Sequence, residues 1–169
     1  ALASGMRVNE ILNTHTTMQD PGTAELAVND AAEAAKFEHV TFTYKDAGAP
    51  SLTDITFTAR PGETIGVIGG TGSGKSTLID LVCRFYDADN GGVALFGHDV
   101  KQYSFAQLRR LVGVVPQQAV LFTGTIRDNM QWAAPGASDE EIWQALEIAQ
   151  AAEFVRGKPG MLDAPVETA

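Results

Sequence analysis

Apolar and polar side chains alternate along two short stretches of the chain. Residues 37–44 place Val40, Phe42 and Tyr44 on one face of an extended strand. A polar turn separates this stretch from residues 54–59, which alternate in the same way. The pattern predicts an antiparallel β-hairpin.

Three further stretches have the composition of strands. Residues 63–68 form a short apolar run, and residues 112–115 are apolar throughout, as expected for a strand covered on both faces of a sheet. Residues 93–96 follow the sequence Asn-Gly-Gly at 90–92, which predicts a hairpin turn there.

Apolar residues at helical spacing recur in the remaining segments. The predicted helices are residues 6–12, 75–86, 125–132 and 138–154, with a short additional one that begins at Ser104. Gln107 follows Ser104 and Glu141 follows Ser138 at the spacing of a helix cap. The polar segment at 13–29 predicts a tether between the first helix and the hairpin.

Composition bounds the class of protein. A chain of 169 residues with 44% hydrophobic residues suits one globular domain with a tail. A net charge of −9 argues against nucleic acid as the main partner. Cys83 is the only cysteine, so no internal disulfide is possible, and its helical neighbours predict a buried thiol. No apolar run approaches the ~18 residues that span a bilayer and no signal peptide opens the chain, so we expect this stretch in the cytosol.

The sequence Gly-Gly-Thr-Gly-Ser-Gly-Lys-Ser-Thr at 69–77 predicts a phosphate-binding loop. It lies between a predicted strand and a predicted helix, which is the context that this motif requires. Its backbone amides are expected to face phosphate oxygens at the positive end of the helix. The predicted nucleotide-binding residues are Gly69, Gly70, Thr71, Gly72, Ser73, Gly74, Lys75, Ser76 and Thr77.

Two residues of this loop have individual expected roles. Lys75 is expected to reach the β- and γ-phosphates of a nucleotide, and the Ser76 hydroxyl is expected to bind Mg²⁺. A glycine-rich turn with an exposed lysine is the alternative interpretation. The flanking strand and helix favour the nucleotide site.

Tyr44 and Gln117 are candidates outside the loop. Tyr44 ends its strand, where its ring can stack on an adenine, although a packing aromatic at the rim of the core explains the same position. Gln117 and Gln118 follow Pro116 at the end of the predicted strand 112–115, an edge at which ligands of open α/β sheets bind. A glutamine there can coordinate Mg²⁺ or orient a water, and solvated turn residues are the alternative.

These features together resemble the nucleotide-binding domain of ATP-binding-cassette (ABC) transporters. The resemblance rests on the order of Tyr44, the loop at 69–77 and the sequence Val-Val-Pro-Gln-Gln-Ala-Val-Leu-Phe at 114–122. Three stretches are similar to the exporter branch in particular: Arg-Phe-Tyr-Asp at 84–87, Thr-Ile-Arg-Asp-Asn at 125–129 and Leu-Asp-Ala-Pro-Val at 162–166. In that branch a six-helix membrane domain precedes the nucleotide-binding domain on the same polypeptide.

The resemblance implies a fold and a division of the chain. The fold is an α/β P-loop NTPase core (the ABC ATPase) with an N-terminal antiparallel β-subdomain and the start of a helical subdomain, and it is incomplete. Residues 1–36 are expected to be the end of a membrane-domain helix plus a linker. Residues 37–122 are the expected nucleotide-binding core with its β-subdomain, and residues 123–169 the expected start of the helical subdomain.

The resemblance also implies cofactors, roles and partners. The cofactors are ATP and Mg²⁺, with Tyr44 stacked on adenine and with Lys75 and Gln117 as the catalytic residues. Ser76 and Gln117 are the implied metal ligands, and Gln117 also couples the site to the membrane domain. The implied partners are a second nucleotide-binding domain and the chain's own transmembrane domain, reached through coupling helices. The parent protein would be a cell-membrane exporter, with this segment on the cytoplasmic side.

Parts of the family pattern do not occur in these 169 residues. They are the Leu-Ser-Gly-Gly-Gln-type signature, the strand that ends in Asp-Glu and carries the general base, and the switch histidine. We therefore expect the chain to bind nucleotide without hydrolysing it, and to belong to a longer transporter. Without its central strand the isolated chain is expected to be unstable or aggregation-prone.

Two other functions stay open at this point. One is a non-catalytic nucleotide-binding module, or the degenerate-site subunit of a heterodimeric exporter. The other is a soluble P-loop ATPase or kinase. The transported substrate cannot be inferred, because the membrane domain selects it.

Overall fold

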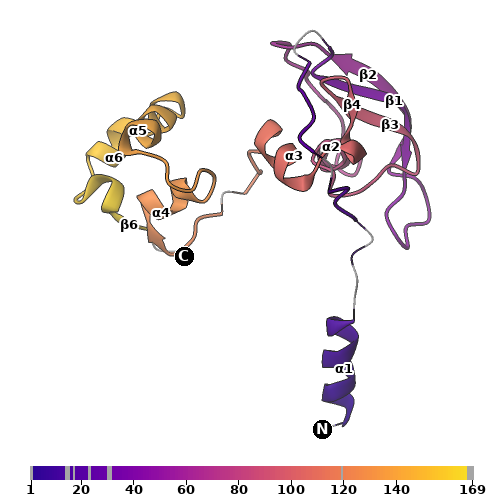
Figure 1. Ribbon diagram of the computed structural model, residues 1–169, viewed down its shortest axis with the longest axis horizontal. Coiled ribbons are helices and arrows are strands. Elements are labelled where there is room, and N and C mark those ends of the chain that lie inside the picture. The colour runs from indigo at the N-terminus through magenta and orange to yellow at the C-terminus, as the bar shows by residue number, and fades with distance from the viewer. Residues whose placement is uncertain are drawn as a thin grey trace. The chain divides into compact units, whose positions relative to one another are not determined.

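The computed structural model describes residues 2–13, 16, 18–22, 24–29, 32–118 and 120–166. The chain divides into two compact units, Ala1–Val114 and Val115–Ala169 (Figure 1). Each unit has a hydrophobic core of its own. The candidate phosphate-binding loop lies wholly in the first unit.

The first unit is built on a four-stranded antiparallel sheet with the strand order β2-β1-β3-β4 (Figure 1). Its strands are β1 (Ala35–Phe42), β2 (Leu52–Ala59), β3 (Asn90–Leu95) and β4 (His98–Asp99). Phe37, Val40 and Phe42 are at most 4% exposed, and a register shift between Phe37 and Val40 lets Phe37 join the core that the alternating Val40 and Phe42 reach. The predicted hairpin of β1 and β2 is confirmed.

The turn predicted at residues 90–92 is wrong, because this segment is the beginning of β3. Gly91 has a φ of 77°, and a Cβ built there would lie 2.3 Å from the carbonyl oxygens of Glu38 and His39. The β1–β3 register shifts between Glu38 and Thr41, next to this contact. Gly91 is therefore needed for β3 to pass close to an irregularity in β1.

The first unit contains the helices α2 (Lys75–Val82) and α3 (Phe105–Leu111) and the 3₁₀ turn η1 (Val100–Gln102). Ser104 caps α3 as predicted, since its hydroxyl accepts a hydrogen bond from the Gln107 amide. Helix α2 ends earlier than the predicted 75–86, because Arg84 has a φ of 53°. The Arg84 amide donates to the Leu81 carbonyl (3.1 Å), and the Phe85 amide donates to the Asp80 carbonyl (2.8 Å). These two bonds close the helix in the manner of a Schellman motif.

Two predicted strands are not formed. Residues 63–68 and 112–115 have no strand structure, and no strand among the described residues pairs with them. Ile68 is 98% exposed and Val115 is 97% exposed. A single extended segment has no ladder partner for its amide and carbonyl groups, so apolar composition alone does not make it a strand.

The second unit is mainly helical (Figure 1). It contains α4 (Ile126–Gln131), α5 (Asp139–Ile148), α6 (Ala152–Arg156), the 3₁₀ turn η2 (Met161–Asp163) and the paired short strands β5 (Gly124–Thr125) and β6 (Pro165–Val166). The single helix predicted at 138–154 is wrong, because Gln150 has a φ of 56° and separates α5 from α6. The predicted cap of Ser138 with Glu141 is confirmed as a full capping box.

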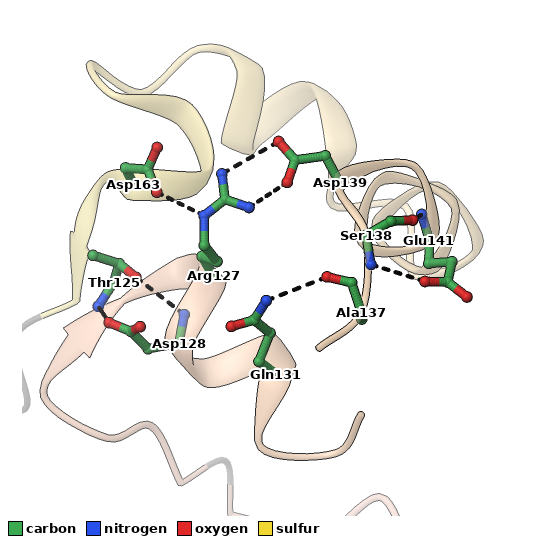
Figure 2. Close-up of polar contacts among 9 residues, drawn as sticks. All are labelled: Thr125, Arg127, Asp128, Gln131, Ala137, Ser138, Asp139, Glu141 and Asp163. Carbon is green, nitrogen blue, oxygen red and sulfur yellow. Dashed lines mark hydrogen bonds and ion pairs between the residues drawn. The ribbon is translucent and has the colours of Figure 1, made fainter. Parts of the chain in front are cut away.

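Arg127 joins three elements of the second unit, as Figure 2 shows. From α4 its guanidinium donates to both carboxylate oxygens of Asp139 at the start of α5, and Nε donates to Asp163 Oδ1 of η2 (2.8 Å). Arg127 hydrogen bonding lowers the pKa of Asp139 below its ordinary value. The hydrophobic core of this unit contains Ile142 and Leu146 of α5 and Leu162 of η2, with Ile126 of α4 packed against it. The elements that Arg127 joins by ion pairs are therefore also joined by apolar contacts.

Helix α1 (Leu2–Leu12) contains the predicted helix 6–12. Its side chains at Met6, Ile11 and Leu12 are between 67% and 75% exposed. Among the described residues, no helix has both the length and the apolar character needed to cross a membrane.

Candidate functional site

The candidate phosphate-binding loop leads directly into helix α2. Gly72 and Gly74 have φ values of 79° and 85°, a backbone conformation that L-residues with side chains rarely adopt. Gly74 is the N-cap of α2, and a Cβ at this position would lie 2.5 Å from the Ser51 carbonyl oxygen and 2.7 Å from Leu52 Cδ2. Glycine therefore lets the start of α2 pack closely against the start of β2.

Lys75 is the first residue of α2, and its side chain turns back over the loop. Nζ donates to the carbonyl oxygens of Gly69 (2.8 Å) and Gly70 (2.6 Å), with a longer contact to Ser73 Oγ (3.4 Å). The ammonium group thus lies at the loop and not on the outer surface of the helix. It places a full positive charge where the helix dipole is also positive.

A cavity of about 250 Å³ lies beside the loop. It is lined by Tyr44, Ser51 and the loop residues 72–77, so it contains most of the residues predicted from the sequence. Gly69 and Gly70 contact Lys75 instead of lining the cavity, and Thr71 is exposed.

Tyr44 is half-buried at the edge of this cavity. Its hydroxyl group lies 3.2 Å from Thr77 Oγ1 and 3.1 Å from Asp80 Oδ2, and it forms a hydrogen bond with each. The Thr77 hydrogen bond lowers the pKa of Tyr44, but burial and the Asp80 carboxylate outweigh it, so the net pKa is raised. The ring also makes edge contacts with Phe42 and Tyr86. Tyr44 therefore packs against neighbouring aromatic residues while it lines the cavity, and its stacking on adenine stays a prediction.

Gln117 and Gln118 lie in the second unit, in a bend where both side chains are exposed. Their relation to the loop stays a prediction, and so does the metal-binding role of Gln117. Two residues of the site were missed from the sequence. Asp80 falls one turn after Thr77 on the same helical face, and this spacing could have indicated it from the sequence. Ser51 is brought to the cavity only by tertiary packing, which leaves no local signal.

The loop suits a polyphosphate. An added Cβ at Gly70 or Gly72 would meet no atom within 4 Å, so the glycine backbone here faces open space. Lys75 supplies a cation, and Ser73 and Ser76 supply hydroxyl groups on the cavity wall. In the described part of the chain no three His, Cys, Asp or Glu residues group to hold a metal.

A family profile described as "ABC transporter" matches residues 52–163, and the chain belongs to this family. The match begins in β2 and includes the loop, α2 and the helices of the second unit. The family and the fold class expected from the sequence are thereby confirmed.

Individual proteins agree with the profile. An uncharacterized ABC transporter ATP-binding protein of Mycobacterium tuberculosis is 39% identical over 153 residues, which are 89% of this chain and 26% of that protein. A multidrug efflux ATP-binding/permease protein of Mycobacterium bovis is 40% identical over 159 residues, covering 94% of this chain and 13% of that protein. The structure of a bacterial Atm1-family ABC exporter with ATP bound has a TM-score of 0.85 and 31% identity, covering 98% of this chain and 29% of that one. The chain thus spans about a quarter of the length of several relatives that it matches.

Proposed function

We propose that this chain is the ATP-binding part of an ABC exporter and that it binds ATP with Mg²⁺ at residues 69–77. The observation that carries the proposal is the single cavity shared by Tyr44 and loop residues 72–77, with the Lys75 ammonium held at the loop beside it. Membership of the ABC transporter family supports it. Because the chain belongs to this family, a small-molecule kinase no longer competes as an interpretation.

Each residue would hold a different part of the nucleotide. Lys75 would pair with the β- and γ-phosphates, and Ser76 would contribute a hydroxyl oxygen to Mg²⁺. Tyr44 would contact the adenine, and Gln117 would contact Mg²⁺ and the attacking water. Bound ATP supplies a phosphoanhydride whose hydrolysis releases the free energy for transport, and catalysis rests on positioning and charge stabilisation.

The whole protein would be a membrane exporter that acts as a dimer. Its transmembrane domain and a second nucleotide-binding domain would be the partners, with this segment on the cytoplasmic side. The names of the relatives support export, since one is a multidrug efflux ATP-binding/permease protein and the similar structure is an ABC exporter. Residues 1–36 would then connect the transmembrane domain to a core at 37–122, and residues 123–169 would begin the helical subdomain.

The 169-residue chain by itself is expected to bind ATP·Mg²⁺ and release no phosphate. Its sequence contains neither the signature nor the strand with the catalytic carboxylate, so we expect the attacking water to have no general base. Titration calorimetry measures the binding, and a phosphate-release assay measures turnover. Phosphate release by this chain above the uncatalysed rate would overturn the expectation. Turnover restored in the full polypeptide would separate an active exporter subunit from a non-catalytic module.

Tyr44→Ala is expected to weaken ATP binding by ~1–3 kcal/mol, the loss of one base–aromatic stacking contact. Tyr44→Phe is the matched control, because it keeps the ring and removes only the hydroxyl that bonds to Thr77 and Asp80. Its ATP affinity is expected to stay close to that of the original chain. Equal ATP affinity in all three proteins would leave Tyr44 with packing alone, while the proposed phosphate site would stand.

A further inference from the structure

The segment that precedes the sheet makes hydrogen bonds to other elements of the first unit along much of its length. This segment, residues 18–22 and 24–28, is called the strap below. The sequence predicts a tether here because the residues are polar and contain a turn. The structure shows hydrogen bonds from the strap to α3, to the end of α2 and to β4.

The firmest contact joins the strap to Gln107 of α3. The Leu26 amide donates to Gln107 Oε1 (3.0 Å), and Gln107 Nε2 donates to the Leu26 carbonyl oxygen (2.6 Å). The Gln107 side chain thus pairs with both backbone groups of one residue, as a neighbouring strand would. Gln107 is only 3% exposed, and the Leu26 side chain packs against the core of the first unit.

A second contact joins the strap to Arg84, which ends helix α2. Arg84 Nη2 donates to the Gln19 carbonyl oxygen (3.1 Å), and Nε donates to Asp87 Oδ1 (3.2 Å). The guanidinium carbon lies 5.2 Å from the centre of the Phe105 ring, at the start of α3. Asp20 of the strap accepts a hydrogen bond from the Phe105 amide (3.0 Å). The strap, the end of α2 and the start of α3 therefore meet at one side chain.

The backbone conformation of Arg84 is one that glycine and asparagine favour and that a long side chain rarely adopts. With a φ of 53° Arg84 occupies the helix-ending site that glycine usually takes. Its side chain is only 6% exposed, and Nη1 is buried with no hydrogen-bond partner in the described part of the chain. A strained, buried arginine persists where surrounding contacts hold it, and such sites are candidates for function. Here those contacts are the hydrogen bond to Gln19 of the strap, the ion pair with Asp87 and the contact with the Phe105 ring.

We propose that Arg84 is a positioning residue that links the phosphate-loop helix to the strap, so that nucleotide at the loop stabilises the docked strap. Helix α2 has Lys75 and Ser76 in its first turn, and Arg84 follows its last turn. A ligand that orders the first turn of a short helix also restricts the motion of its other end. The strap is the segment between α1 and the sheet, so this link gives nucleotide a route to the chain that precedes the nucleotide-binding core. The inference rests on the proposed function, because it takes ATP as the ligand.

Amide hydrogen exchange of the strap in the full polypeptide, with and without ATP·Mg²⁺, tests the link. We expect ATP·Mg²⁺ to slow strap exchange by at least about fivefold, the lower end of typical coupling between two sites. Arg84→Gly is expected to remove this slowing. Glycine suits the backbone at this position, so the variant keeps the helix end while losing the guanidinium.

An affinity measurement and a control variant complete the test. The ATP affinity of Arg84→Gly is expected to change little, because the strap is docked with or without nucleotide and only its rare opening is affected. Arg110→Ala is the matched control: it removes an exposed ion pair to Glu25 of the same strap, and such pairs contribute little. This control should keep the ATP-dependent slowing.

The possible failures are distinguishable. If ATP binds and strap exchange does not change, the link is wrong and the proposed function stands. The link is equally wrong if ATP·Mg²⁺ still slows strap exchange in Arg84→Gly. It is also wrong if ATP·Mg²⁺ no longer slows strap exchange in Arg110→Ala. If the titration shows no ATP binding, the proposed function fails and the link fails with it. Docking of the strap is checked without nucleotide by Gln107→Met, which can neither donate to the Leu26 carbonyl oxygen nor accept from the Leu26 amide and should speed exchange by about tenfold.

Discussion

Lys75→Ala is expected to abolish tight binding of ATP·Mg²⁺. The ammonium group lies at the loop within hydrogen-bond distance of the Gly69 and Gly70 carbonyl oxygens, so it is close to where phosphates would sit. A hydrogen bond to a charged group contributes about 1.5–3 kcal/mol, and Lys75 is expected to reach two phosphates. The loss is therefore about 3 kcal/mol or more, at least roughly a hundredfold in Kd. Titration calorimetry with ATP·Mg²⁺ measures it.

Two variants control for other effects of this change. Lys45→Ala removes an exposed lysine from the turn between β1 and β2, so it has the same change in net charge and should bind ATP normally. Lys75→Gln keeps a donor for the loop carbonyl groups and removes the charge, so it should bind as weakly as Lys75→Ala. Undiminished affinity in both Lys75 variants would contradict the phosphate-loop proposal. Loss of affinity in Lys75→Ala alone would assign the effect to the shape of the loop.

Gly91→Ala is expected to have the largest effect on the stability of the first unit. A Cβ at residue 91 would lie 2.3 Å from two backbone carbonyl oxygens of β1, and backbone atoms cannot move aside as the end of a flexible side chain can. The left-handed backbone adds about 1–2 kcal/mol and the steric overlap about 1–3 kcal/mol. Unfolding in urea, followed by circular dichroism, should show a loss of roughly 2–5 kcal/mol.

The neighbouring glycine provides the control for this prediction. A Cβ at Gly92 would meet only Asp99 Oδ2, at 3.8 Å, which is ordinary van der Waals contact. Gly92→Ala removes a glycine from the same strand without steric overlap, so its stability should stay within about 1 kcal/mol of the original. If the two variants unfold at the same urea concentration, the close approach of β3 to β1 does not limit stability.

Features that depend on neighbouring residues could be predicted from the sequence. Ser104 and Ser138 cap helices because each has its partner three residues later, and the β1–β2 hairpin follows from alternation across a short turn. The phosphate loop was equally visible, because its residue types and spacing are fixed by the chemistry of phosphate binding.

The C-terminal ends of two helices could not be predicted from the sequence. Arg84 and Gln150 both close helices with a left-handed backbone, where glycine would normally mark the end. Because neither residue type indicates such a conformation, the predicted helices at 75–86 and 138–154 ran past both points. Docking of the strap could not be predicted for the same reason, since its main contact joins Leu26 to Gln107, a residue far along the chain.

Strands depend on partners as well as on composition. Asn90-Gly-Gly has the sequence of a turn, yet Gly91 serves a close contact with β1 that only tertiary structure reveals. Residues 63–68 and 112–115 have the composition of buried strands, yet they pair with no strand in the described part of the chain. Tyr44 and Gln117 could be predicted as candidates because each comes at the end of a predicted strand.

The separate cores of the two units have a consequence for the rate of folding. The core of the second unit joins Ile142, Leu146, Val155 and Leu162, which are close along the chain. The first unit must pair Phe37 with Val93, and closing so long a loop is entropically slow. The second unit is therefore expected to fold quickly, while the sheet that positions the phosphate loop limits the rate at which the first unit folds.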